Sequence, residues 1–185
     1  MRACFQRRKG LGWAGLFAGL IGGLTATIAM SKFQSTWKTA TRGRVPIEEN
    51  SDRFAGCPAT QPTDVETARI LLIRIADLAG YEFSDVTATK AALALHYGIG
   101  VSGGLVYFLA GTSLFPRFQK EHSLLAGAAF GAALFLVADI AVLPLMGFPS
   151  KGSLSPLGTR LYGMTSHLIY GLTAAEMCSV VRNLL

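Results

Sequence analysis

The stretch from Gly131 to Pro149, GAALFLVADIAVLPLMGFP, decides the fold class of this chain. Its apolar composition is typical of the later part of a membrane-spanning helix, which Pro144, Gly147 and Pro149 are expected to end. Asp139 lies well inside this stretch. A carboxylate at that depth costs about 2.5–3.5 kcal/mol on insertion scales. Asp139 therefore needs a partner from the protein or a water-filled cavity, and the identity of that partner bears directly on function.

The composition of the whole chain agrees with an integral membrane protein. Of its 185 residues, 51% are hydrophobic and only 15% are charged, whereas soluble domains carry about 25% charged residues. The net charge of +6 comes mainly from short segments beside the apolar runs, where lipid headgroups explain it. A nucleic-acid-binding surface would need a basic face with aromatic residues, and the sequence shows none. The lipid bilayer is therefore the expected partner, and nucleic acid is not.

Known catalytic and metal-binding motifs are absent from the sequence. There is no GxSxG, no phosphate-binding loop, no HExxH and no dinucleotide motif in a strand–helix context. The three cysteines, Cys4, Cys57 and Cys178, have neither CxxC nor CxxCH spacing, so they indicate no disulfide framework, zinc site or haem attachment. The sequence therefore favours a protein that is not an enzyme and that holds no cofactor.

Apolar runs and the polar segments between them predict an all-α fold, an integral membrane bundle of four transmembrane helices plus one amphipathic surface helix. The predicted segments are a basic tail at 1–10, transmembrane helices at 11–31, 91–115, 123–148 and 159–181, and an extramembrane segment at 32–90 that carries the amphipathic helix at 63–79. The first run is longer than the apolar region of a signal peptide, about 7–15 residues, so it is expected to be retained. Residues 33–41 are expected to extend it beyond the membrane.

The amphipathic helix has recognisable start and stop signals. Thr63 and Glu66 match a capping box at its start, and Gly80 is expected to end it. Apolar residues share one face and charged residues share the other, so the helix either lies on the membrane surface or caps the bundle. The mixed signs of its charges favour the cap.

Glycines at a spacing of four residues predict close helix packing. Gly15, Gly19 and Gly23 form two successive GxxxG steps in the first helix, and Gly127 and Gly131 form another in the third. Such glycines let helix backbones approach closely in lipid. The ridge in the first helix is interpreted as a packing seam within the chain, with a homodimer contact as the alternative.

Ionisable side chains at a shared depth form the candidate site. His96, Asp139 and His167 come from three predicted helices, and each lies roughly 8–14 Å below the same membrane face, counted at about 1.5 Å per residue. Small residues share their helix faces, as expected for stripes directed to the interior. We therefore expect the three side chains to converge, with Tyr107 and Tyr170 nearby.

A second intramembrane acid, Glu176, lies apart from this set. It is on the opposite face of its helix from His167 and nearer the other leaflet. We expect it to pair with Arg117, with Lys120 or with the basic tail at 1–10.

Convergence of His96, Asp139 and His167 would have four interpretations, in the following order of preference. The first is a structural knot of hydrogen bonds. The second is a proton or ion site, because burial disfavours the charged forms of acid and imidazole and lets such a pair exchange a proton near neutral pH. The third is a metal site, since two histidines and a carboxylate suit zinc or non-haem iron. The fourth uses the two histidines as axial ligands of a haem or a pigment.

A series of motifs runs through the second half of the chain. They are, in order, His96-Tyr97-Gly98, Gly103-Gly104 with Tyr107, Gly127-x-x-Phe130-Gly131, Asp139, Pro144-Leu-Met-Gly-Phe-Pro149 and Leu161-Tyr-Gly-Met-Thr-Ser-His167-Leu-Ile-Tyr-Gly-Leu172. In this order they resemble the YagU-like family, small bacterial inner-membrane proteins of unknown function. The resemblance implies a multi-pass protein of the bacterial inner (cytoplasmic) membrane and assigns no catalytic residues. A link of such proteins to acid resistance would agree with a buried set of histidines and an aspartate.

Two hypotheses for the function follow. In the first, the chain is a non-catalytic accessory or structural subunit of a larger membrane assembly or a small homo-oligomer, with the glycine ridge of its first helix as an outward contact. In the second, it is a proton- or ion-linked transport or acid-stress protein that uses the buried cluster. In both, four spans put the N- and C-termini on the same side, and the basic tail favours the cytoplasmic side.

Overall fold

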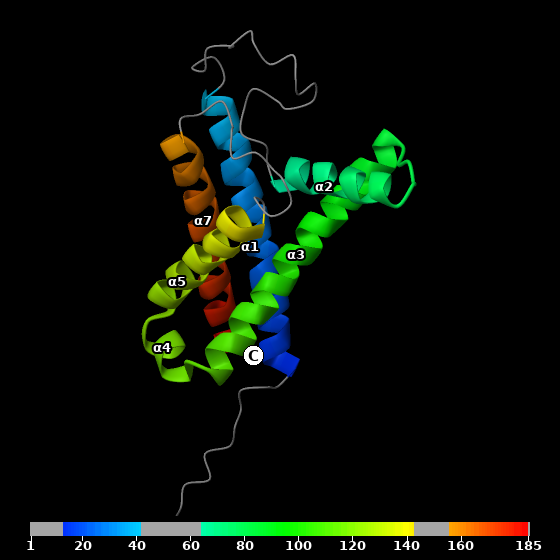
Figure 1. Ribbon diagram of the computed structural model, residues 1–185. Helices are drawn as coiled ribbons and strands as arrows, with labels where there is room; N and C mark the ends of the chain where they lie inside the picture. Colours follow the sequence, from blue (N-terminus) through cyan, green and yellow to red (C-terminus); the bar gives the residue numbers. More distant parts are fainter. Residues whose placement is uncertain (1–12, 42–63, 143–155, 185) are drawn as a thin grey trace, which may run out of the picture.

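The computed structural model describes residues 13–41, 64–142 and 156–184, and the regular structure in these ranges is entirely helical (Figure 1). The helices are α1 (Trp13–Thr41), α2 (Asp64–Leu78), α3 (Asp85–Ser113), α4 (Pro116–Glu121), α5 (Ser123–Phe135), the π-helical segment η1 (Leu136–Val142) and α7 (Pro156–Leu184). The predicted all-α fold class is therefore confirmed. The basic tail at 1–10, Cys4 and Cys57 lie outside the described residues.

Three helices are long and apolar enough to cross a membrane. They are α1, α3 and the continuous stretch Ser123–Ala141, which joins α5 to most of η1. The sequence predicts a fourth such helix at 159–181, but α7 is not apolar enough, because hydroxyl-bearing and charged residues are spread along it. The composition of the helices thus indicates a membrane protein with three candidate spans.

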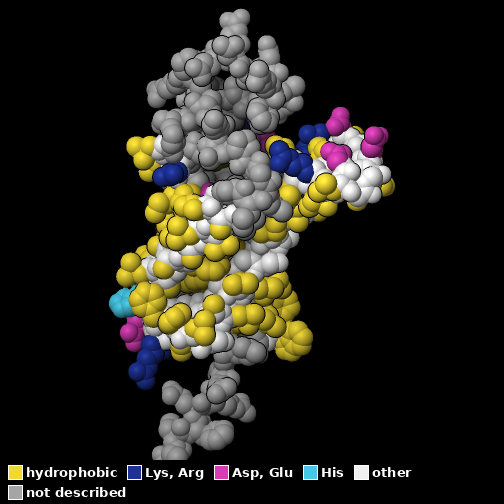
Figure 2. Space-filling view, in the orientation of Figure 1, with side chains coloured by type: hydrophobic (Ala, Val, Ile, Leu, Met, Phe, Trp, Pro, Cys, Tyr) yellow, Lys and Arg dark blue, Asp and Glu magenta, His cyan; other side chains and the backbone are white. Residues whose placement is uncertain are grey.

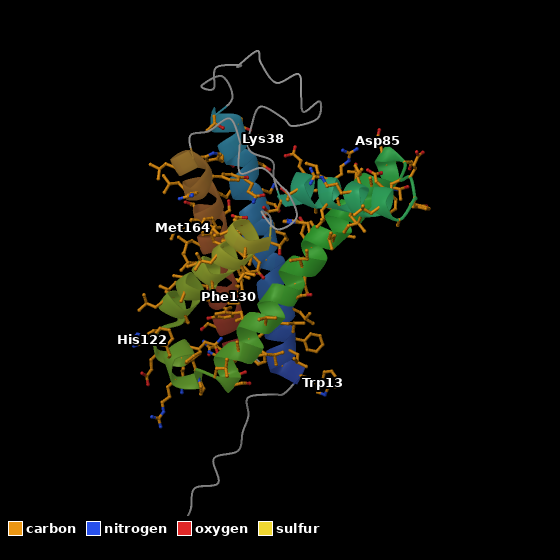
Figure 3. All side chains as sticks on the ribbon, in the orientation of Figure 1. Trp13, Lys38, Asp85, His122, Phe130 and Met164 are labelled. Atoms are coloured by element: carbon orange, nitrogen blue, oxygen red, sulfur yellow. The ribbon has the colours of Figure 1, made fainter. Side chains whose placement is uncertain are left out.

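The distribution of side chains over the surface agrees with this conclusion. Figure 2 shows hydrophobic side chains over most of the visible face of the bundle, while charged side chains gather around α2 at one end and around α4 at the other. Figure 3 labels Lys38 and Asp85 near the first of these ends and Trp13 and His122 near the second. An apolar band with charged groups at both ends matches the profile of a bilayer.

Helices α1 and α7 form the centre of the bundle. Their mutual contact is the most extensive, while α3 packs against α1 and α5 packs against α7. By contrast, α3 touches α5 and α7 only slightly. The core between the helices includes Ala26, Met30, Tyr170 and Ala174. In Figure 1, α2 lies across the direction of α1, toward the end of the bundle where α1 finishes.

Glycines bring α1 and α3 into backbone contact. A Cβ atom at Gly23 would lie 2.7 Å from the carbonyl oxygen of Gly100, and one at Gly104 would collide with the backbone of Gly19 and Gly23. A Cβ atom at Gly15 would collide with a side chain of α3. The ridge of Gly15, Gly19 and Gly23 therefore faces α3 of the same chain, which leaves it unavailable to a second copy.

Helices α5 and α7 meet in the same way. A Cβ atom at Gly127 would lie 2.6 Å from the carbonyl oxygen of Gly171, and one at Gly131 would collide with the backbone of α7 at His167. In return, a Cβ atom at Gly171 would collide with the backbone of α5. Gly127 and Gly131 thus lie in an internal seam, and this seam fixes how α5 and η1 stand against α7.

The helix ends differ in places from the sequence-based boundaries. Helix α3 begins at Asp85 rather than at 91, because the hydroxyl of Ser84 caps it by accepting a hydrogen bond from the N–H of Thr87. The polar turn at 116–122 contains the short helix α4, with Pro116 in the first turn, where proline is tolerated. Helix α1 continues to Thr41, as predicted.

The helix predicted at 123–148 changes its hydrogen-bonding pattern partway along. It is α-helical over α5 and π-helical over η1, a change that the sequence does not signal. The expected stop at Pro144, Gly147 and Pro149 lies outside the described residues. Segments of π-helix occur frequently at functional sites, and η1 carries Asp139.

Helix α2 lies within the range 63–79, where the sequence predicts a helix. It is followed by Gly80, whose φ of 70° is the left-handed conformation expected of a helix stop. Its first turn is tied to α1, because Lys38 Nζ lies 2.5 Å from a carboxylate oxygen of Glu66. Its charged face thus contacts the bundle as well as solvent.

Candidate functional site

The partner of Asp139 is His167 of α7. Asp139 Oδ2 lies 3.7 Å from His167 Nδ1, and the same nitrogen donates a hydrogen bond to the carbonyl oxygen of Gly163 at 3.0 Å. The side chain of Asp139 is 25% exposed and that of His167 is 11% exposed. Asp139 thus lies beside an imidazole, a side chain whose charge can change near neutral pH.

Local structure on both helices brings these two side chains together. A Cβ atom at Gly163 would collide with the carboxylate of Asp139, so the glycine leaves the space that the carboxylate fills. The ring of Phe135 packs beside the imidazole of His167, with centroids 6.2 Å apart. The π-helical hydrogen bonds of η1 shift the residues after Phe135 relative to a continuous α-helix. The pair therefore depends on η1, on Gly163 and on the glycine seam between α5 and α7.

His96 has a different partner. It is buried on α3, and its Nε2 lies 3.0 Å from the hydroxyl oxygen of Ser31 on α1. No group of three histidine, cysteine, aspartate or glutamate side chains in the described ranges could hold a metal ion. The predicted convergence is corrected accordingly, because α3 packs against α1 and makes little contact with α5 or α7. Asp139 and His167 form one site, and His96 forms another with Ser31.

Replacement of Ser31 by alanine is expected to lower the free energy of unfolding by about 1–3 kcal/mol, because the buried imidazole of His96 would lose its hydrogen-bond partner. Thermal unfolding of the detergent-purified protein measures this loss. Ser35→Ala is the matched control, since Ser35 is exposed one turn further along α1 and its hydroxyl bonds to the backbone of its own helix. Equal stability of the two variants would show that the contact between Ser31 and His96 contributes nothing.

The two tyrosines of the predicted cluster lie in different places. Tyr170 donates a hydrogen bond to the carbonyl oxygen of Gly100, 2.5 Å away, and so links α7 to α3. Tyr107 lies about 16 Å further along α3 than His96, where its ring packs against Phe130 of α5 with centroids 5.3 Å apart. Tyr170 therefore connects two helices of the core, and Tyr107, contrary to expectation, is not part of the site.

Glu176 also differs from its predicted role. It is exposed on α7 and accepts a hydrogen bond from the hydroxyl of Ser123, 3.3 Å away. Within the described residues it forms no ion pair with Arg117 or Lys120, and the basic tail lies outside them. Glu176 is thus separate from the pair of Asp139 and His167.

A polar stripe on α1 is not among the features predicted from the sequence. Ser31, Gln34 and Lys38 follow the spacing of one helix face, and they contact α3 and α2. Gln34 is only 1% exposed, and its side-chain oxygen accepts a hydrogen bond from the backbone N–H of Asp64 at 3.2 Å. The spacing of three and four residues is the signal that could have found this stripe.

An aromatic cluster connects the stripe to α7. The rings of Phe33, Trp37 and Tyr162 have centroids between 5.7 and 6.3 Å apart. Tyr162 directly precedes Gly163, whose carbonyl holds the imidazole of His167. The polar stripe, the aromatic cluster and the Asp139–His167 pair are therefore neighbours at the α2 end of the bundle.

Comparison with known protein families, with curated proteins and with solved structures finds no match to this chain. The resemblance to YagU-like proteins stays a prediction from the motifs. Function is therefore inferred from the geometry of the site.

Proposed function

We propose that this chain is a small polytopic membrane protein that takes up and releases a proton at Asp139 and His167, in a proton-linked transport or acid-stress role. The observation that carries the proposal is the 3.7 Å contact between Asp139 Oδ2 and His167 Nδ1 on the π-helical segment η1. A carboxyl and an imidazole at this distance can each take up a proton, and the charge on one influences the protonation of the other.

In this proposal, α7 crosses the membrane together with the three apolar helices, which makes four spans. Helix α7 needs less apolar surface than the others because α1 and α5 both pack against it and shield it from lipid. Helix α2 then caps the end of the bundle that holds the pair, through its contacts with Gln34 and Lys38. The family resemblance supports the bacterial inner membrane, and the basic tail supports cytoplasmic termini.

The alternative functions have less support. An accessory subunit was expected to use the ridge of Gly15, Gly19 and Gly23 as an outward contact, but that ridge faces α3 within the chain. A haem or pigment held by two histidines would need them at one site, whereas His96 and His167 bond to different helices. Because the glycine ridge faces α3 within the chain, a Gly19→Leu variant would disturb folding under either hypothesis. The discriminating variant is therefore at Asp139.

The test is an infrared pH titration of the protein in lipid nanodiscs, which reports protonated carboxyl groups directly. We expect the wild type to show a carboxyl band that appears and disappears reversibly near neutral pH, and Asp139→Asn to lack it. Glu176→Gln is the matched control, because Glu176 is an acid of the same bundle that bonds to Ser123 rather than to a histidine. It should keep the band. An unchanged band in Asp139→Asn would contradict the proposal.

A further inference from the structure

The start of α2 is anchored on the interior of the bundle. The backbone N–H of Asp64 donates to the side-chain oxygen of Gln34, which is almost fully buried on α1. One turn further along α1, Lys38 forms an ion pair with Glu66, which lies in the first turn of α2. Two contacts to neighbouring turns of α1 fix both the position and the direction of the first turn of α2. The carboxylate of Asp64 is therefore held at the end of the bundle rather than free in a loop.

The helix that anchors Asp64 also contacts both histidine sites. Gln34, which holds the backbone of Asp64, lies one turn of α1 after Ser31, the partner of His96. Trp37, one turn further along α1, packs against Tyr162, which directly precedes the Gly163 that accepts a hydrogen bond from His167. The charged groups near this anchor within the described residues include Glu66 and Lys38, which pair with each other, while His167 contacts Asp139. Asp64 is thus anchored at the end of the bundle where α1 leads to both histidine sites.

Two buried N–H groups on α1, one of them on the side chain that holds Asp64, have unused hydrogen-bonding capacity. Gln34 Nε2 and Trp37 Nε1 are buried and have no hydrogen-bond partner in the described part of the chain. The oxygen of the same Gln34 amide is the one that holds Asp64, and the ring of Trp37 lies 5.8 Å from that of Tyr162. Buried polar groups of this kind are usually satisfied by ordered water. The two donors therefore mark where ordered water would bind between the Gln34 that holds Asp64 and the Trp37 that packs on Tyr162.

We propose that Asp64 is the residue through which protons enter the Asp139–His167 site, with Gln34 as the positioning residue that holds it there. This inference rests on the proposed function. The carboxylate of Asp64 takes a proton from bulk water and becomes a neutral carboxyl group. It then gives the proton, through the water held at Gln34 and Trp37, to the carboxylate of Asp139, and returns to its charged form. Asp139 is left neutral beside His167.

The experiment follows the Asp139 carboxyl band by infrared spectroscopy after a rapid change of pH, with the full chain in nanodiscs. We expect Asp64→Asn to slow the response of the band at least about tenfold, as the loss of a general acid–base group does, while the final amplitude stays that of the wild type. Added imidazole, a small diffusible proton carrier, should restore the rate. Gln34→Leu should also slow the response, because it releases Asp64 from α1.

The control variant is Asp77→Asn, which removes an exposed acid from the far end of α2 and should respond at the wild-type rate. A wild-type rate in Asp64→Asn would overturn the inference, and so would a slow response that imidazole does not restore, since that indicates a merely structural role. Absence of the Asp139 band from the wild type would instead overturn the proposed function. If Asp64→Asn fails to fold, Asp64→Glu replaces it as the test. This variant keeps a carboxylate at position 64, so the Asp139 band should respond at the wild-type rate if Asp64 carries the proton. A slower response would overturn the inference.

Discussion

The Gly104→Leu variant is expected to yield no stably folded protein. The backbones of α1 and α3 touch at this point, so that even a Cβ atom would collide with the backbone of Gly19 and Gly23. Overpacking a core usually costs about 1–3 kcal/mol, but backbone atoms cannot rotate away as a side chain can, so the cost should be larger at this seam. It would approach the whole stability of a domain, about 5–15 kcal/mol. The yield of monodisperse protein in detergent, followed by thermal unfolding, measures the effect.

Gly98→Leu is the matched control for this prediction. It makes the same substitution in the same helix, at a position where an added Cβ would meet no heavy atom within 4 Å. We expect it to fold as the wild type does. If Gly98→Leu is lost as completely as Gly104→Leu, then a general intolerance of α3, and not its seam with α1, is the cause.

Gly171→Leu is expected to have a comparable effect at the other seam, where the damage should also reach the proton site. A Cβ atom at Gly171 would collide with the backbone of Gly127 and Gly131, so a leucine forces α5 and η1 away from α7. Asp139 and His167 stand on opposite sides of that seam. The 3.7 Å contact between them should be lost, because a leucine side chain at this seam moves the two helices that carry the pair apart.

The smaller substitution Gly171→Ala lets the site be observed in protein that still folds. Its infrared titration should show the Asp139 carboxyl band moved or broadened relative to the wild type. Gly23→Ala is the matched control, since it crowds the seam between α1 and α3, which does not hold the pair. That variant should lose stability while its Asp139 band stays in place. Equal disturbance of the band in both variants would show that the two seams are not independent.

The architecture could be predicted where a physical signal lies along the sequence. Long apolar runs identified α1, α3 and the stretch from Ser123, because membrane solubility is a property of composition. Gly80 ended α2 as expected, since a left-handed residue after a helix is usually glycine. The start of α3 was missed because Ser84 caps it outside the apolar run. The span predicted at 159–181 is not confirmed as an apolar helix, because hydroxyl-bearing and charged residues are spread along α7.

The site could be predicted only in part. The cost of burying Asp139 predicted a partner for it, and counting residues along the helices predicted a shared depth for His96 and His167. Depth does not give rotation about the helix axis, so the sequence could not show that His96 faces Ser31 while His167 faces Asp139. The change to π-helix at η1 is a shift of hydrogen bonds without a signature in composition. Gln34 was overlooked because a polar residue beyond an apolar run is ordinarily exposed.

The central pair of helices, α1 and α7, is also the pair most distant along the chain. The thiol of Cys178 donates a hydrogen bond to the carbonyl oxygen of Ala18 at 3.3 Å, across 160 positions of sequence. In the proposed membrane topology, α1, α3 and α5 would be synthesised before the helix that joins them. A chain that ends before α7 would hold Asp139 without its imidazole. Synthesis of α7 would then both close the bundle and supply the partner of that carboxylate.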